Sequence, residues 1–233
     1  MKKRNFLPFT KLIVLLFAAV LFNSCIKNNN FIKGDAKVRI FQSSSTDTTQ
    51  NFFINGRPLG SVTTYGTNSS YIVVGGDSTY NFSSRAITEA VDNATLNQQK
   101  LLIGKNYSLF LTRKTSTTPP SLVLYEDDVR KSVDSVKLIF IHFGHTLGSS
   151  VNISDAGNSF TTFSMVYGNR STKMLKVNDK TKISFVLSTP TPTNPQPVVK
   201  ALDATTLTNG FVYTVIIDGS KSGELQNRLV TSN

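Results

Sequence analysis

The sequence predicts an all-β protein built from two tandem β-sandwich domains that follow a secretory leader. From Ala36 onward, short alternating segments rich in Val, Ile, Phe, Tyr, Thr and Ser are separated by Gly, Asn, Asp and Pro. This texture is typical of sandwiches made from many short strands. Several segments recur about 100 residues further on, which indicates a tandem duplication.

The leader has the layout of a lipoprotein signal peptide. Lys2, Lys3, Arg4 and Lys11 are basic, and residues 12–22 form an apolar run. Ser24 then precedes Cys25, the only cysteine of the chain. A basic region, a short hydrophobic region and a small residue before the cut describe a secretory signal. Cleavage before a cysteine resembles the lipobox of bacterial envelope lipoproteins. We therefore expect Cys25 to become the acylated first residue.

Phe22 and Asn23 stand where a lipobox more often has small residues, so the processing enzyme would have to accept a relaxed site. The alternative is a retained transmembrane anchor. The apolar run is shorter than the roughly 20 residues that a spanning helix needs. We therefore expect a lipid anchor in the cell envelope, at the outer membrane, on its periplasmic face or at the cell surface.

The chain divides into four predicted segments. They are a signal peptide (residues 1–24), the lipidated cysteine with a tether (25–35), a first sandwich (36–128) and a second sandwich (129–233). The tether is polar and cannot pack, and the boundary falls in a charged segment, residues 126–131. Each domain is large enough to bury a core without disulfides or metal.

Three pairs of segments support the duplication. Residues 37–41 recur as 137–141, Tyr65-Gly66 as Tyr167-Gly168, and 107–111 as 213–217. The spacing drifts along the chain, as expected when loops differ in length while strands are kept.

Turn residues predict hairpins between several strands. Asn55-Gly56 follows Phe52 and Ile54, and Asp155-Ala156-Gly157 follows Val151 and Ile153. A four-residue loop over residues 75–78 would pair Val73 with Tyr80 and Tyr71 with Phe82. A three-residue loop over residues 178–180 would pair Leu175 with Ile183.

Two stretches depart from the strand pattern. Residues 88–100 tolerate a helix, although their apolar positions are too sparse for an amphipathic face. Residues 189–197 are rich in proline, whose missing amide donors exclude a central strand and predict a loop.

Each copy resembles the β-sandwich family catalogued as domain of unknown function 4397. The resemblance is carried by the opening strands (37–41 and 137–142), the hairpin turns, the two Tyr-Gly pairs, the Gly-x-x-Tyr-[Ser/Thr] strands (104–108 and 210–214) and Asp127-Asp128. At the position where the family has a histidine, the second copy has His142 and the first copy has Gln42. The resemblance implies an immunoglobulin-like fold and brings no catalytic residues.

The residues offer little for catalysis. If Cys25 carries lipid, the mature chain has no free thiol. Cysteine nucleophiles, redox pairs and cysteine-ligated zinc are then excluded. His142 and His145 are the only histidines, and a pair lacks the further ligands that a metal needs. A Ser-His-Asp triad can be drawn without a G-x-S-x-G motif to support it. Most aspartates fall in turns, which weakens paired-carboxylate chemistry. No cofactor motif occurs.

The charge balance favours anionic partners. The formal charge is +11, and loss of the four basic leader residues leaves about +7. A basic envelope protein is attracted to anionic glycans or lipid headgroups, although the same charge also serves solubility. Nucleic acid is not expected because no recognition motif is present.

One basic segment is a candidate anion site. Its members lie within thirteen residues: Arg170, Lys173, Lys176, Lys180 and Lys182. The predicted three-residue loop sets Lys176 across from Lys182, and opposed like charges are destabilising unless something compensates. The alternative is an edge strand that lysines protect against aggregation.

These observations predict a non-enzymatic, lipid-anchored envelope protein that acts as a binding or structural module. The predicted partners are the membrane, through the anchor, and an anionic glycan or an envelope protein. The main alternative is a glycan-binding outer-membrane lipoprotein of a polysaccharide-uptake system. Tyrosines are the only polar aromatic platform for sugars, and most are expected to pack in the cores. An envelope hydrolase is a less favoured third interpretation.

Overall fold

A computed structural model describes residues 34–156, 160–189 and 199–232. Residues Gly34–Asn233 belong to one compact unit. The signal peptide, Cys25 and most of the tether lie outside the described residues, as do Gly157 of the predicted turn and most of the Pro-rich segment. Among the described residues, no helix is long and apolar enough to cross a membrane.

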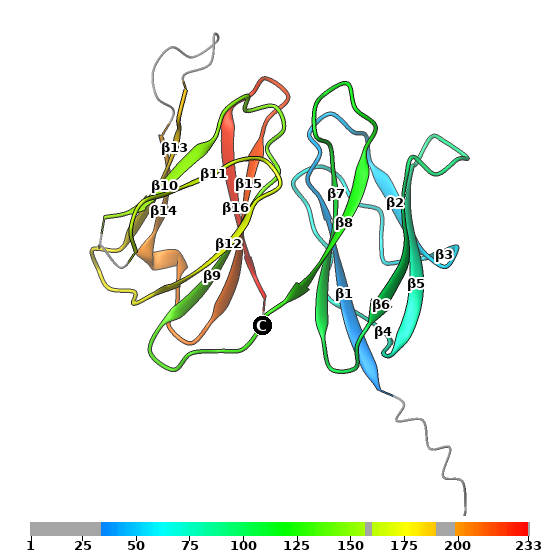
Figure 1. The fold of residues 1–233 in the computed structure, drawn as a ribbon, viewed down its shortest axis with the longest axis horizontal. Helices are drawn as coiled ribbons and strands as arrows, with labels where there is room; N and C mark the ends of the chain where they lie inside the picture. Colours follow the sequence, from blue (N-terminus) through cyan, green and yellow to red (C-terminus); the bar gives the residue numbers. More distant parts are fainter. Residues whose placement is uncertain (1–33, 157–159, 190–198, 233) are drawn as a thin grey trace, which may run out of the picture. The chain divides into compact units, whose positions relative to one another are not determined.

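The described chain is all-β with almost no helix, as predicted (Figure 1). The first half holds β1 (Asp35–Gln42), β2 (Gln50–Ile54), β3 (Arg57–Pro58), β4 (Ile72–Gly75), β5 (Ser78–Ala86), β6 (Ala94–Leu101), β7 (Asn106–Thr112) and β8 (Ser121–Asp127). The second half holds β9 (Val136–His142), β10 (Val151–Asp155), β11 (Phe163–Met165), β12 (Arg170–Leu175), β13 (Lys182–Leu187), β14 (Val199–Asp203), a 3₁₀ turn (Ala204–Thr206), β15 (Val212–Gly219) and β16 (Leu225–Thr231).

Each half is a sandwich of two four-stranded sheets. The first pairs sheet β4-β1-β7-β8 with sheet β3-β2-β5-β6, and the second pairs β12-β9-β15-β16 with β11-β10-β13-β14. A buried apolar cluster fills each sandwich, built around Ile40, Phe82 and Leu109 in the first and around Phe140, Phe185 and Val215 in the second. The strand order is the same in both halves, as a tandem duplication predicts.

The register of the two halves also matches. β1 runs parallel to β7 with Val38 opposite Tyr107, and β9 runs parallel to β15 with Leu138 opposite Tyr213. The amide of Leu102 donates to the Tyr107 hydroxyl at 3.0 Å, and the amide of Thr208 donates to Tyr213 at 3.2 Å. The recurring Gly-x-x-Tyr motif therefore fixes the same corner in each sandwich.

The Asn55-Gly56 hairpin is confirmed. Ile54 pairs with Arg57, and both turn residues have positive φ, 47° and 74°. Two residues in the left-handed region match a two-residue turn whose twist suits the flanking strands.

The two hairpins predicted over residues 75–78 and 178–180 are wrong. β4 pairs with β1 and β5 pairs with β2 and β6, so the chain crosses from one sheet to the other at residues 75–78. β12 and β13 are divided in the same way between β9 and β10. The alternation of apolar and polar residues shows which side chains face the core. It does not show the sheet to which a strand belongs, because strands in facing sheets have the same pattern as strands in one sheet.

Residues 88–100, the helix-tolerant stretch, include the edge strand β6. This strand contains a β-bulge opposite Tyr80 and Phe82, where Gln98 has φ 57°. A bulge disturbs the regular pairing of an edge and is one way in which sheets avoid adding further strands.

Candidate functional site

The two sandwiches meet through their sheets β4-β1-β7-β8 and β12-β9-β15-β16. A third buried apolar cluster lies between these sheets and contains Phe41, Phe110, Ile139, Ile141, Phe143, Val212 and Ile216. Phe41 and Phe110 of the first half stack with centroids 4.5 Å apart, and Phe143 of the second half lies 5.1 Å from Phe110. β9 and β15 are consequently buried on both faces.

We call the contact between these two sheets the joint. A buried arginine lies in it. Arg39 on β1 is 2% exposed, and its guanidinium reaches the second half, donating to Thr231 O at 3.0 Å, Thr214 Oγ1 at 3.0 Å and Ser232 Oγ at 2.8 Å. Its Nε donates to Ser108 of its own half at 2.8 Å. The charge also lies over the rings of Phe41 and Tyr71, 4.9 and 4.8 Å from their centroids. Arg39 thus connects β1 and β7 of the first half with β15 and β16 of the second.

Asp127 at the end of β8 balances this charge. Its Oδ2 lies 3.6 Å from Arg39 Nη2 and accepts hydrogen bonds from Ser108 Oγ at 2.6 Å and Tyr71 Oη at 2.7 Å. Burial raises the pKa of Asp127, although Arg39 and both hydroxyl donors act in the opposite direction. Burial and the nearby Asp127 carboxylate also raise the pKa of Tyr71. We call Arg39, Tyr71, Ser108, Asp127, Thr214 and Ser232 the Arg39 cluster.

A second ion pair lies in the same joint. Arg228 on β16 donates from Nε to Asp218 Oδ2 at 2.5 Å and from Nη2 to Ser43 Oγ of the first half at 3.0 Å. Asp218 is fully buried, and burial raises its pKa against the opposing effect of Arg228. Tyr65 of the first half donates at 3.1 Å to Gly219 O and Gln226 Oε1. The joint is therefore polar at two separate points.

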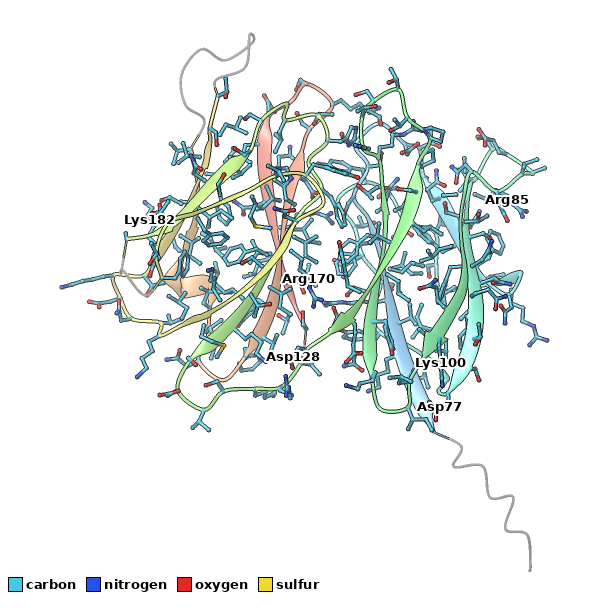
Figure 2. All side chains as sticks on the ribbon, viewed as in Figure 1. Asp77, Arg85, Lys100, Asp128, Arg170 and Lys182 are labelled. Atoms are coloured by element: carbon cyan, nitrogen blue, oxygen red, sulfur yellow. The ribbon has the colours of Figure 1, made fainter. Side chains whose placement is uncertain are left out.

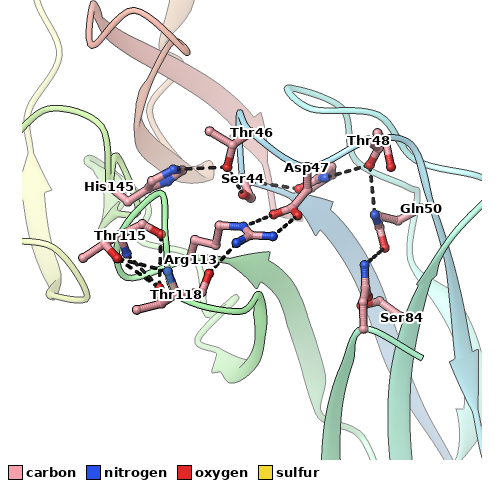
Figure 3. Close-up of polar contacts among 12 residues, drawn as sticks. Ser44, Thr46, Asp47, Thr48, Gln50, Ser84, Arg113, Thr115, Thr118 and His145 are labelled. Atoms are coloured by element: carbon pink, nitrogen blue, oxygen red, sulfur yellow. Dashed lines mark hydrogen bonds and ion pairs between the residues drawn. The ribbon is translucent and has the colours of Figure 1, made fainter. Parts of the chain in front are cut away.

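Loops from both halves meet beyond the carboxyl ends of β1, β7, β9 and β15 (Figure 3). Asp47 accepts two hydrogen bonds from Arg113, at 2.8 and 2.6 Å, and Arg113 also donates to Thr118 O. Thr46 Oγ1 lies 3.5 Å from His145 Nε2 across the joint. Burial would raise the pKa of Asp47, but the hydrogen bonds from Arg113 and Ser44 lower it overall. Burial lowers the pKa of His145.

This arrangement lacks the geometry of a catalytic triad. Both carboxylate oxygens of Asp47 accept from Arg113, so the carboxylate does not orient an imidazole, as a triad requires. His142 is buried, and its burial lowers its pKa to about 4. Among the described residues, no group of three or more His, Cys, Asp or Glu side chains could hold a metal ion. Nothing in the described part of the chain indicates catalysis.

A cavity of about 340 Å³ adjoins the connection between the halves, lined by residues 104–106 and 126–130. Its charged walls are already paired, Lys105 with Glu126 at 2.7 Å and Arg130 with Asp128 at 2.7 Å. These pairs leave no concentration of one charge for an ionic ligand.

The predicted basic residues do not lie on one hairpin. Arg170 lies beside the first half, where it donates to Glu126 O at 2.9 Å and covers the Tyr125 ring, whereas Lys182 lies on the outer sheet across from Asp203 (Figure 2). Lys176 lies beyond the end of β12, 3.5 Å from Asp134. The predicted opposition of Lys176 and Lys182 is therefore wrong, because Lys176 follows β12 and Lys182 begins β13, and these two strands lie in different sheets.

The two remaining basic residues are also apart. Lys173 lies over the Phe163 ring at 4.6 Å, and Lys180 lies in the loop that leads to β13. Whether any of the five binds an anion stays a prediction.

The tyrosines at repeated positions divide into two groups. Tyr107 and Tyr213 are buried, as predicted. Tyr65, Tyr71 and Tyr167 are half-buried and place their hydroxyls in the joint, Tyr167 at 2.9 Å from Thr112 Oγ1. Neither these roles nor the Arg39 cluster follows from local sequence patterns. The one signal in the sequence is that a charged residue, Arg39, occupies a strand position where the second copy has Ile139.

Comparison with known proteins identifies the class. The model of the family described as "Domain of unknown function (DUF4397)" matches residues 36–154. The match covers more than half of the chain, so the protein belongs to this family. It runs through the whole first sandwich and through β9 and β10, past the predicted boundary at residue 128.

The matching structures include a crystal structure described as a "putative cell adhesion protein" from Bacteroides uniformis ATCC 8492. It shares 13% identity, with 84% of this chain and 98% of that chain covered and a TM-score of 0.25. No curated protein matches the sequence.

Proposed function

We propose that the protein is a non-enzymatic, lipid-anchored protein of the cell envelope in which two joined sandwiches act as a binding or structural module. The observation that supports this most directly is the use of the polar groups. The buried charges at the joint pair with each other, Arg39 with Asp127 and Arg228 with Asp218, and both arginines also donate to the other half. Among the buried atoms of these four side chains, Asp218 Oδ1 and Arg228 Nη1 lack a hydrogen-bond partner. An enzyme would instead present convergent titratable groups to a substrate in a cleft.

The joint favours a rigid module over two independently moving domains. It combines a buried apolar cluster with hydrogen bonds from one half to the other. Domains that move freely usually meet through smaller, more polar surfaces. We also propose that each sandwich is immunoglobulin-like, which the repeated tyrosine corner at Tyr107 and Tyr213 supports.

The anchor is proposed at Cys25, with the protein at the outer membrane. Several acyl chains would hold a protein firmly, whereas one chain alone gives only marginal membrane binding. The test measures lipid labelling of the wild type and of Cys25→Ala in cells grown with a clickable palmitate analogue. We expect label only in the wild type and accumulation of a precursor in the variant or under globomycin.

Unchanged labelling of Cys25→Ala would refute the anchor. The non-enzymatic part has its own test, a broad panel of hydrolase substrates. Turnover that disappears in His145→Ala, with the fold retained, would contradict it.

A further inference from the structure

The loops beyond the ends of β1, β7, β9 and β15 form one continuous surface from both halves. We call residues 43–49, 113–120, 143–150 and 219–224 the distal loops. Contacts connect them in a chain: Arg113 with Asp47, Thr46 with His145, and Thr146 Oγ1 with Ser220 O at 2.7 Å. Because the joint holds the halves together, this surface is composite and neither half forms it alone.

The distal loops lie at the far end of β1 from the tether. Gly34 marks the end where the tether joins the fold, and β1 runs from Asp35 to Gln42 before the first loop begins at Ser43. Eight extended residues span about 26 Å. The distal loops therefore lie at the opposite end of β1 from the residue that follows the predicted tether.

Hydroxyl groups dominate this surface. Exposed members are Thr48, Thr115, Ser116, Thr117 and Ser222, and half-buried members include Thr46, Thr118, Thr146, Ser149, Ser150 and Ser220. Each hydroxyl is one donor and two acceptors, so those that bond to a neighbour keep further capacity. Such side chains suit a ligand that itself presents many hydroxyls.

Two other ligand classes fit poorly. Protein partners are usually held by aromatic or aliphatic anchors, and none of the exposed large hydrophobic side chains of the described chain lies in the distal loops. Acidic polymers are usually held by clustered positive charge, but Arg113 is paired with Asp47, and the distal loops otherwise carry only two lysines, Lys114 and Lys221, with one glutamate, Glu224.

We propose that the distal loops are a binding surface for neutral polysaccharide, recognised through hydroxyl hydrogen bonds. This deepens the proposed function as a binding module and rests on that part of the proposed function, not on the anchor. The distal loops have no exposed large aromatic platform, so each site binds weakly and repeated chains of sugar bind better than short ones.

The test is affinity electrophoresis of the full chain carrying Cys25→Ser in detergent, in gels containing dextran, mannan, xylan or β-glucan, with polygalacturonate as the acidic probe. The loop variant removes four exposed hydroxyls, Thr48→Ala, Ser116→Ala, Thr117→Ala and Ser222→Ala. The matched control removes four exposed hydroxyls elsewhere, Thr79→Ala, Thr95→Ala, Ser70→Ala and Ser164→Ala. Thermal unfolding of both variants checks that the fold is intact.

We expect retardation by at least one neutral polysaccharide, about tenfold weaker in the loop variant and unchanged in the control. Absence of retardation by every neutral polysaccharide overturns the proposal, as does equal binding by the loop variant. Binding to polygalacturonate alone, lost with Lys180→Glu, would overturn it in favour of the basic residues. Because the lipid is absent, failure here leaves the anchor untouched.

Discussion

At equivalent points of the two parallel strand pairs, the first half carries Arg39 beside Ser108 and the second carries Ile139 beside Thr214. At the ends of the last strands, Asp127 corresponds to Ser232. The two backbones are alike. The face of the first half carries the charge pair of Arg39 and Asp127, whereas the face of the second half carries two hydroxyls and the aliphatic side chain of Ile139. The two faces are therefore complementary, and the buried arginine finds acceptors that its own copy does not provide.

The tyrosines show how far the two halves still act alike. Tyr65 reaches Gly219 and Gln226 of the second half, and its counterpart Tyr167 reaches Thr112 of the first. Thr112 and Asp218, the neighbour of Gly219, correspond in the repeat. Such reciprocal contacts are typical of a two-fold interface between identical subunits. The joint thus combines a nearly symmetric framework with an asymmetric charge cluster.

The strongest test of this asymmetry is Arg39→Met against Ile139→Met. Loss of Arg39 leaves Asp127 buried without its cation, which should lower the free energy of unfolding by about 3–5 kcal/mol. Ile139→Met exchanges similar volumes and should cost less than about 1.5 kcal/mol. Urea unfolding measures both. Equal effects would show that the arginine is not the distinguishing element.

Acidity should reduce the penalty of Arg39→Met. Burial already raises the pKa of Asp127 above 3.8, and loss of Arg39 removes an influence that lowers it. A carboxyl whose folded pKa is raised takes up a proton on folding, so its contribution to stability is lost as pH rises through that window. The difference between variant and wild type should be smaller at about pH 4.5 than at about pH 7.5. A penalty that grows on acidification would contradict this assignment.

The symmetric part is tested by Tyr65→Phe and Tyr167→Phe. Each change removes one hydroxyl from the joint, so each should lower the free energy of unfolding by about 1 kcal/mol. Tyr65→Phe should have the larger effect because its hydroxyl contacts two acceptors. Thermal unfolding of the two variants compares them directly, and a stabilising effect of either would show that its contact is not made.

The smallest expected effect concerns the basic residues. Lys176 follows β12 and Lys182 begins β13, and these strands lie in different sheets. The effects of Lys176→Glu and Lys182→Glu on the free energy of unfolding should therefore be additive within about 0.5 kcal/mol. Lys182→Glu places a like charge across from Asp203 and should be slightly destabilising. A double-mutant cycle measures the coupling. Strong coupling would restore the hairpin that the sequence analysis predicted.

Local signals in the sequence were sufficient for much of the fold. Strand alternation, the Asn55-Gly56 turn and the repeated Gly-x-x-Tyr segments predicted an all-β chain with two copies of one topology. These features depend on neighbours within a few residues, whose conformational preferences act locally. The duplication added long-range information, because two copies of one strand pattern imply two copies of one set of pairings.

The partner of each strand and the chemistry of the joint were decided only by the tertiary structure. β4 and β5 follow each other in the chain, yet they pair in different sheets, because an apolar side chain is equally well buried by a neighbour in its own sheet or by one across the core. Arg39 is stable in its buried position only where Asp127 of β8, Thr214 of β15 and Ser232, directly after β16, converge on it. No local pattern encodes that convergence, since it arises from packing between the two halves.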